Sequence, residues 1–420
     1  MAAPVLYTLT SDLHGEMARD ARREPFVQAI EAALGEPFDC RGADFNAYGQ
    51  AEGPELIYVR TGGTEGLFRK QFPAPAPGKA FYLLASGQSN SLAASMEILS
   101  WLQQRGIPGE ILHGSPEAIA ARLGALSGAK TAVSHPDAPK TGVPGAKDAF
   151  LHPIDFGRIL AERRFGVIGK PSDWLISSDV DYAAARDILG AELVDIPIGE
   201  LVEEARKGGW TLPKDFSLNA LNAPRYGLKL DAEDWKGALD IYGALRRLVA
   251  RYRLDGLTLR CFDLLGALHN TGCLALAILN TEGVTATCEG DIPAMLSMAV
   301  ARARTGSASF QVNLSRIESD RLLFAHCTIP LSLVRNYCYD THFESGFGVA
   351  VHGEMPEGEV TLFKLSPDLK RMVRIPARLV ENPYGDNLCR TQVVVEAPGA
   401  AEYFLRSPIG NHHVIVPGKL

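Results

Sequence analysis

The stretch Gly283-Val284-Thr285-Ala286-Thr287-Cys288-Glu289-Gly290-Asp291 decides how the rest of the chain is interpreted. Apolar and β-branched residues lead into it, as in a buried parallel strand. A helix is predicted just beyond it, because Pro293 suits a first helical turn. Glu289 then lies at the carboxyl end of a strand, where open α/β sheets bind their ligands. The simpler alternative is a Glu that only caps the next helix.

Length and composition are those of an ordinary globular protein. The chain has 420 residues and a formal net charge of -7, which predicts two or three domains and argues against a nucleic-acid partner. No apolar run is long enough to span a bilayer and no signal-peptide pattern opens the chain, so we expect a cytoplasmic protein without a membrane partner. The seven cysteines include no C-x-x-C pair and are expected to be reduced thiols.

The first predicted domain, residues 1–150, alternates strands with helices, which is typical of a Rossmann-like parallel α/β sheet. Polar loops with glycine, at 60–65 and 86–91, follow two of its strands, but neither matches a nucleotide-binding motif. Residues 134–147, rich in Pro, Gly, Ala and Lys, are predicted to be a linker or exposed loop. Strands are expected at 5–9, 55–59, 80–85 and 110–113, and helices at 25–34 and 92–104.

The second predicted domain, residues 151–305, repeats this alternation and carries Glu289. It is therefore predicted to be a second Rossmann-like α/β domain. The expected strands are 165–169, 192–198 and 256–261, followed by the strand before Glu289, and the expected helices are 181–189, 198–207, 231–252 and 274–280.

The character changes in the third predicted domain, residues 306–420, where helical periodicity fades. Short β-rich segments separated by Gly and Pro turns predict an antiparallel barrel or sandwich. The expected strands are 309–314, 321–327, 348–352, 359–365, 392–395 and 413–416.

Six polar residues stand out in apolar or strand-rich surroundings. Carboxylate and imidazole ligands together suit a divalent metal such as Mn²⁺, with Mg²⁺, Co²⁺ or Zn²⁺ as competitors. A lone strand histidine is more often a satisfied core residue, so spacing alone leaves both interpretations open. Adjacent strand residues face opposite ways, so at most one member of the His-His pair should face a given site. The six are Glu289, His326, His342, Glu344, His412 and His413.

Several of these residues lie in motifs that resemble the L-fucose isomerase-related family, which shares its fold with L-arabinose isomerase. The order of two Rossmann-like domains and a β-rich domain is similar too. The resemblance covers most of the chain and is strongest from Thr258 onward. The motifs are Thr-Cys-Glu-Gly-Asp-Ile-Pro at 287–293, Ala-His-Cys at 325–327, His-Phe-Glu-Ser-Gly at 342–346, Leu-Cys-Arg-Thr-Gln at 388–392 and Gly-Asn-His-His at 410–413.

The resemblance implies a metal, usually Mn²⁺, held between the second and third domains. Glu289 matches the family's ligand at a strand end, and His412 or His413 matches its late histidine ligand. The place of a further acidic ligand is taken by Asn313, whose amide can bind a metal or a hydroxyl but cannot act as a base at neutral pH. Another acid then has to act, and Asp291, Glu318 and Glu344 are the candidates.

The implied reaction is aldose–ketose isomerisation through an ene-diolate, with the metal as Lewis acid. We assign catalytic roles to Glu289 as base and to Asn313 and His326 as partners of metal or substrate hydroxyls. The candidate substrate-binding residues each have a structural alternative: a surface strand pair for His342 and Glu344, an ion pair for Arg390, and a helix cap for Asp263.

The sequence therefore predicts a metal-dependent sugar isomerase whose substrate is a pentose or a simple, deoxy- or C6-substituted hexose. Two alternatives remain: another metal-dependent ene-diolate enzyme, such as an aldolase or epimerase, and a non-catalytic sugar-binding protein. The resemblance also implies a homo-oligomer, hexamer-like in the family. In it, the loops at 60–65 and 86–91 are expected to cover a neighbour's site.

Overall fold

The computed structural model describes residues 3–11, 20–75, 79–128, 149–210, 230–385 and 387–420. The expected linker at 134–147 lies outside these ranges. No helix within them combines the length and the apolar composition needed to cross a bilayer.

The first sheet is parallel and has five strands in the order β2-β1-β3-β4-β5. The buried strands of this sheet, such as β3 with all five residues buried, are nearly continuous apolar runs, as expected for a sheet with helices on its faces. Its strands are β1 (Val5–Leu9), β2 (Asp39–Gly42), β3 (Glu55–Val59), β4 (Phe81–Ala85) and β5 (Gly109–Leu112), and its helices are α1 (Pro25–Leu34), α2 (Glu65–Gln71), α3 (Ser91–Gln104) and α4 (Pro116–Gly128).

The second sheet is also parallel, with four strands in the order β10-β9-β7-β8. Its longest helix, α8, begins where the side chain of Asp231 accepts hydrogen bonds from the amides of Glu233 and Asp234. The strands are β7 (Arg164–Ile168), β8 (Glu192–Ile196), β9 (Gly256–Leu259) and β10 (Thr285–Cys288), and the helices are α6 (Tyr182–Ala184), a π-turn (Ala185–Leu189), α7 (Ile198–Arg206), α8 (Ala232–Tyr252), α9 (Asp263–Leu268), α10 (Cys273–Thr281) and α11 (Ile292–Thr305).

The third sheet is antiparallel and has seven strands in the order β15-β18-β11-β12-β17-β16-β6. Because β15 also pairs with β16, every strand except β6 belongs to a closed barrel, which leaves few free edges. The elements are β6 (Leu151–Pro153), β11 (Phe310–Glu318), β12 (Arg321–His326), β15 (Gly358–Leu365), β16 (Arg371–Glu381), β17 (Thr391–Glu396), β18 (His413–Pro417), the separate hairpin β13 (Asn336–Asp340) and β14 (Ala350–Glu354), and helix α12 (Ala400–Arg406).

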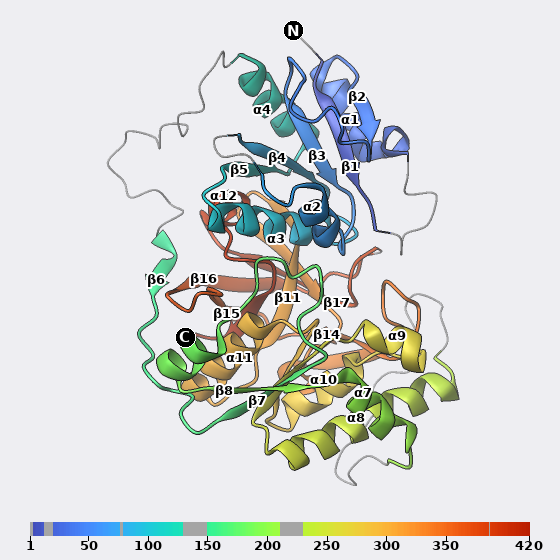
Figure 1. Cartoon of the computed structure of the whole chain (residues 1–420), viewed down its shortest axis with the longest axis vertical. Coiled ribbons are helices and arrows are strands. Elements are labelled where there is room, and N and C mark those ends of the chain that lie inside the picture. The colour runs from blue at the N-terminus through green and yellow to red at the C-terminus, as the bar shows by residue number, and fades with distance from the viewer. Residues whose placement is uncertain (1–2, 12–19, 76–78, 129–148, 211–229, 386) are drawn as a thin grey trace.

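The predicted fold class, two parallel α/β regions followed by a β-rich region, is confirmed. The barrel lies between the two parallel sheets, with the N-terminal sheet on one side and the Glu289-bearing sheet on the other (Figure 1). Helix α3 contacts β11 from one side and α11 contacts β15 and β18 from the other. The carboxyl end of β10 therefore faces the barrel strands that carry the candidate histidines.

Candidate active site

Glu289 follows β10 in an unusual backbone conformation. Its φ is +66°, and Gly290 continues with φ +72°. A residue with a side chain rarely adopts this left-handed region, and such strain is concentrated at functional sites. The turn is held by hydrogen bonds from the Ser172 amide to the Glu289 carbonyl (3.0 Å) and from the Gly290 amide to the Leu259 carbonyl (3.0 Å). Glu289 does not cap α11, because Asp291 is the N-cap residue.

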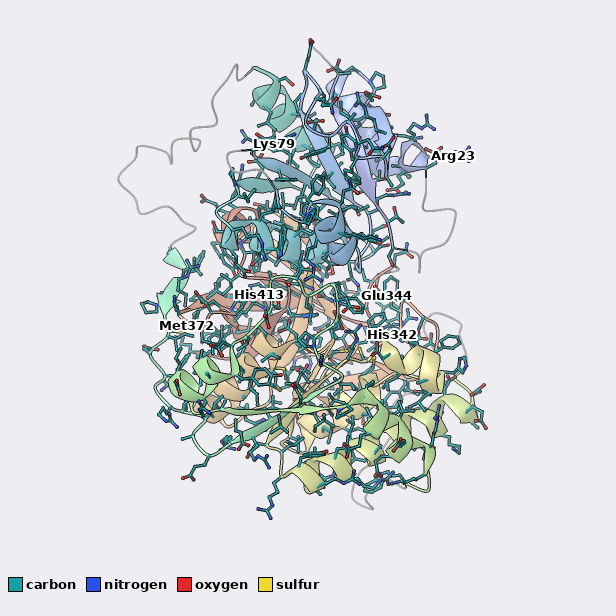
Figure 2. The ribbon with its side chains drawn as sticks, viewed as in Figure 1. Arg23, Lys79, His342, Glu344, Met372 and His413 are labelled. Carbon is teal, nitrogen blue, oxygen red and sulfur yellow. The ribbon has the colours of Figure 1, made fainter. Side chains whose placement is uncertain are left out.

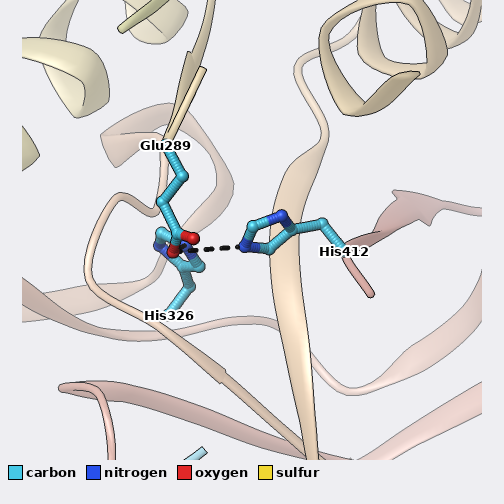
Figure 3. Close-up of side chains that lie close together, drawn as sticks. All are labelled: Glu289, His326 and His412. Atoms are coloured by element: carbon cyan, nitrogen blue, oxygen red, sulfur yellow. Dashed lines mark ion pairs between the residues drawn. The ribbon is translucent and has the colours of Figure 1, made fainter. Parts of the chain in front are cut away.

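The turn directs the Glu289 carboxylate toward two histidines from the barrel (Figure 3). Its Oε1 lies 3.3 Å from Nε2 of His412 and 3.9 Å from Nε2 of His326. His326 is the last residue of β12, and His412 immediately precedes β18. Their ligand atoms and the carboxylate lie within 4.8 Å of one another. A site between the second and third sheets is thus assembled from three distant parts of the chain.

Buried charges fix the His412 ring. Its Nδ1 lies 2.8 Å from Oδ2 of Asp291, and its carbonyl accepts a 2.7 Å hydrogen bond from Nζ of Lys364. Glu97 accepts a 2.8 Å hydrogen bond from the amide of Asn411, the residue before it. All of these groups are buried: Lys364 and Glu97 hold the backbone, and turning the imidazole would break its contacts with Asp291 and Glu289.

The donor set fits a divalent metal. The Nε2 atoms of His326 and His412 are buried and accept no hydrogen bond from the described residues, and the same holds for Oδ1 of Asn313. A carboxylate holding the far side of a histidine ring, as Asp291 does for His412, is the usual outer support of a metal-binding imidazole. Two imidazoles, a carboxylate and an amide oxygen suit Mn²⁺, Co²⁺ or Zn²⁺ better than Ca²⁺.

The electrostatics agree with a site built for a cation. Burial alone would raise the pKa of Glu289, but the charges of His412 and His326 and the hydrogen bond from Trp174 outweigh it and hold this pKa below its ordinary value. Burial likewise opposes charge on His412, yet Glu289 and Asp291 raise the pKa of this ring to about 10. Without a metal the ring carries a proton, and a metal ion would have to displace it.

An open pocket leads to this cluster. Its wall contains three glutamates and two aromatic side chains, and the described lining includes no Lys or Arg. The lining residues are Gly62, Gly63, Glu65, Asn90, Ala93, Ala94, Trp174, Phe262, Glu289, Asn313, Glu344 and Asn411.

Both glycine-bearing loops of the first sheet thus lie at the pocket of their own chain. This differs from the expected placement over a neighbour's site. Their positions are fixed within the chain, since the Gly62 amide donates to the Ser89 carbonyl (2.8 Å) and the Asn90 side chain donates to Glu344 (2.8 Å).

Glu344 and His342 lie close together beneath the first sheet (Figure 2). Burial, and next the charge of Glu289, raise the pKa of Glu344 to about 7 against the lowering effect of the hydrogen bond from Asn90. His342 does not line the pocket; its Nδ1 is 3.0 Å from the Ser345 hydroxyl and its ring packs edge-on against Phe262. His342 therefore supports the pocket wall from behind.

Three expected site residues lie elsewhere. Both ring nitrogens of His413 are engaged away from the cluster, with Nε2 2.9 Å from the Tyr403 hydroxyl and Nδ1 2.8 Å from the Asn411 carbonyl. This is the alternation expected for adjacent strand residues, since its neighbour faces the cluster. Arg390 donates to the Thr341 carbonyl (2.7 Å), and Asp263 pairs with Arg260 (3.0 Å). Neither residue lines the pocket.

Two residues of the site were not predicted from the sequence. Trp174 donates a 2.6 Å hydrogen bond from Nε1 to Oε2 of Glu289 and packs edge-on against Phe262. Glu65, at the start of α2, is 2% exposed and lines the pocket. The only sequence signal was position, because each lies just past the carboxyl end of a parallel strand.

No protein-family model matches the sequence. The chain is similar to proteins named sulfoquinovose isomerase. Those of Priestia aryabhattai and Priestia megaterium (strain ATCC 12872 / QMB1551) are each 23% identical to it over 326 residues, which is 71% of this chain and 72% of the relative. That of Clostridium sp. (strain MSTE9) is 28% identical over 188 residues, or 40% of each chain.

Proposed function

We propose that this protein is a metal-dependent aldose–ketose isomerase that acts on an open-chain sugar through an ene-diol. The observation that carries the proposal is the buried group of Glu289, His326 and His412 at the end of a pocket that also holds a second, separately placed acid, Glu344. The similarity to proteins named sulfoquinovose isomerase supports the same class of reaction.

Glu289, His326 and His412 would hold the metal, with the amide oxygen of Asn313 as a further donor in the pocket wall. A bound divalent ion would supply Lewis-acid stabilisation of the negative charge that develops on the sugar oxygens. Trp174 and Asp291 keep the carboxylate and the imidazole oriented, so little reorganisation is needed when the sugar arrives.

Glu344 is the group we assign to proton transfer. Isomerisation takes a proton from C2 of the aldose and returns one to C1, so the same carboxyl group must accept and donate near neutral pH. A pKa of about 7 suits this task. Glu289 is less suited, because its two oxygens face Trp174 and the histidines and its pKa is lowered. Asn90 fixes the Glu344 carboxyl from the opposite wall.

The acidic wall favours an uncharged sugar. Sulfoquinovose carries a sulfonate, and binding an anion in a buried pocket requires a cationic partner. The described lining offers Glu65, Glu289 and Glu344 but no Lys or Arg. The aromatic faces of Trp174 and Phe262 instead suit the apolar C–H side of a pentose or a simple hexose.

The test is a substrate screen followed by ¹H NMR. Purified protein would be incubated with Mn²⁺ and with neutral aldoses, neutral ketoses and a 6-sulfonated hexose, and exchange of the C2 proton with deuterated water would be recorded. We expect interconversion of one aldose–ketose pair, abolished in Glu289→Gln. Cleavage of the carbon chain, or inversion at a single carbon, would instead assign the site to an aldolase or epimerase.

We also propose that the protein is a homo-oligomer. Support comes only from the family resemblance, because the loops expected to reach a neighbour line the pocket of their own chain. Light scattering at assay concentration measures the mass directly, and a fully active monomer would overturn this proposal.

A further inference from the structure

Glu65 is a carboxyl group that the proposed reaction does not use. It begins α2, and the loop before it is locked by a 2.9 Å hydrogen bond from the Thr64 hydroxyl to the Thr61 carbonyl. Gly66 packs against the segment that carries Trp174, since a Cβ on Gly66 would lie 3.4 Å from the Asp173 carbonyl. The backbone on both sides of Glu65 is therefore held in place, and its side chain lines the pocket.

Among the described residues no ion pair involves this carboxyl group, and the hydrogen bond that favours its charged form comes from its own backbone amide. Its Oε2 is buried and has no hydrogen-bond partner among the described residues. Two buried cations are committed elsewhere: Arg60 pairs with Glu24, and Lys364 pairs with Asp291 and the His412 carbonyl. A buried ion without such a partner is strongly disfavoured.

The charges around Glu65 also favour its neutral form. Burial raises the pKa of Glu65 well above its ordinary value, and the negative charges of Glu97, Glu289 and Glu344 raise it further. The titratable groups that act on Glu65 are thus acids. In its neutral form the carboxyl group carries an O–H that needs an acceptor, and the free protein supplies none to Oε2 among the described residues.

We propose that Glu65 is a specificity-determining residue: as a neutral acid it donates a hydrogen bond to one hydroxyl oxygen of the bound sugar. The proposal rests on the proposed function for the identity of the ligand. It assigns the first sheet a role in choosing the sugar, whereas the metal ligands come from the second and third sheets and Glu344 from the loop of the separate β13–β14 hairpin. A sugar lacking that hydroxyl leaves the buried donor unpaired, and such sites discriminate strongly against the deoxy analogue.

The test uses two substitutions of similar size. Glu65→Gln keeps a neutral donor, and Glu65→Leu removes it. Binding of the preferred sugar and of its monodeoxy analogues would be measured by ligand-observed NMR, alongside turnover and metal content. We expect Glu65→Gln to bind within about threefold of the wild type and Glu65→Leu to bind roughly 10- to 100-fold more weakly, with metal content unchanged in both.

One monodeoxy analogue should identify the contact. It should bind the wild type and Glu65→Leu equally, because the hydroxyl that Glu65 meets is already missing. Equal losses for Glu65→Gln and Glu65→Leu would show that an ionised carboxylate is needed and would overturn the proposal. The proposal would also be overturned if Glu65→Leu lost its metal, or if Glu65→Leu bound the preferred sugar as tightly as the wild type does. If the wild type binds sugars but turns none over, the isomerase proposal fails while the binding comparison still decides the role of Glu65.

Discussion

Asp291 contributes both to the candidate metal site and to the stability of the fold. The substitution Asp291→Asn separates its role as a helix cap from the role of its charge. Its Oδ1 accepts the 2.7 Å capping hydrogen bond from the Ala294 amide, and its Oδ2 faces Nδ1 of His412 at 2.8 Å and Nζ of Lys364 at 4.0 Å. Asn keeps the shape and the cap acceptor. It removes the charge and places either a donor or a weaker acceptor against the imidazole.

The magnitude follows from what is left behind. Lys364 is fully buried, and removing one partner of a buried ion pair costs about 3–5 kcal/mol. The charge of Glu97 also acts on Lys364, so we expect a loss near the lower end, about 3 kcal/mol. The free Nδ1 side of His412 no longer has its carboxylate support, and metal affinity should fall about 10- to 100-fold.

The matched control is Asp231→Asn, which changes the exposed N-cap of α8 in the same way. Asn and Asp are equivalent caps, so this variant should unfold within about 0.5 kcal/mol of the wild type. Urea denaturation of the metal-free proteins and metal titration by calorimetry give the two readouts. If Asp291→Asn matches the control in both, the buried network around His412 does not hold the ring as we argue.

Four further outcomes are expected. Glu289→Gly should lose the metal yet be about 1 kcal/mol more stable by thermal unfolding than Glu289→Ala, because only glycine is unstrained at φ +66°; the reverse order would contradict the strain. Burial lowers the pKa of His113 to about 4. The unfolded chain therefore binds this proton first, and the free energy of unfolding should fall by up to about 3 kcal/mol as pH falls from 6.5 to 4. His113→Gln should flatten the stability–pH slope in that window, and the exposed His269→Gln should not. Trp174→Phe keeps the ring packing but removes the hydrogen bond to the Glu289 carboxylate, so metal affinity should fall about tenfold. An unchanged affinity in the metal titration would contradict a role of Trp174 in orienting Glu289. Asn313→Ala should lower turnover roughly 10- to 1,000-fold in steady-state assays, and full activity would remove Asn313 from the site.

Much of the fold was predictable because local and tertiary preferences agree. The strand before Glu289 and the helix after it follow from an apolar run and an early Pro, and the structure has β10 and α11 there. The expected strand at 192–198 ends earlier, at Ile196, because Pro197 follows and caps α7.

Strand β16 (Arg371–Glu381) was not predicted, and the reason is tertiary. It contains Pro376 and four charged residues, Arg371, Arg374, Arg378 and Glu381, which argue locally for an edge or a loop. In the structure it pairs with β15 on one side and with β17 on the other, and thereby closes the barrel. This segment forms a strand because it closes the barrel, and no short stretch of the sequence indicates that closure.

Residues of the candidate site could be predicted only where the residue type itself indicates a chemical role. Buried histidines and a strand-end Glu could be singled out, but not which histidine of 412–413 faces inward or that Trp174 would reach Glu289. The Asn90–Glu344 hydrogen bond joins residues 254 positions apart. Such contacts depend on how the first sheet docks on the barrel.

The pocket also shows why composition alone could not assign roles to its acids. Glu289, Glu344 and Glu65 are chemically identical and line one cavity. Two imidazoles and an indole N–H favour the ionised form of Glu289, so it suits a cation. Burial and the charge of Glu289 raise the pKa of Glu344 to about 7 against the amide hydrogen bond from Asn90, which suits a group that must both accept and donate a proton. Burial and the neighbouring acids raise the pKa of Glu65 well above its ordinary value against the hydrogen bond from its own backbone amide, which favours the neutral form. The three glutamates thus take different roles because their surroundings differ: Glu289 suits a metal ligand, Glu344 a proton carrier and Glu65 a hydrogen-bond donor.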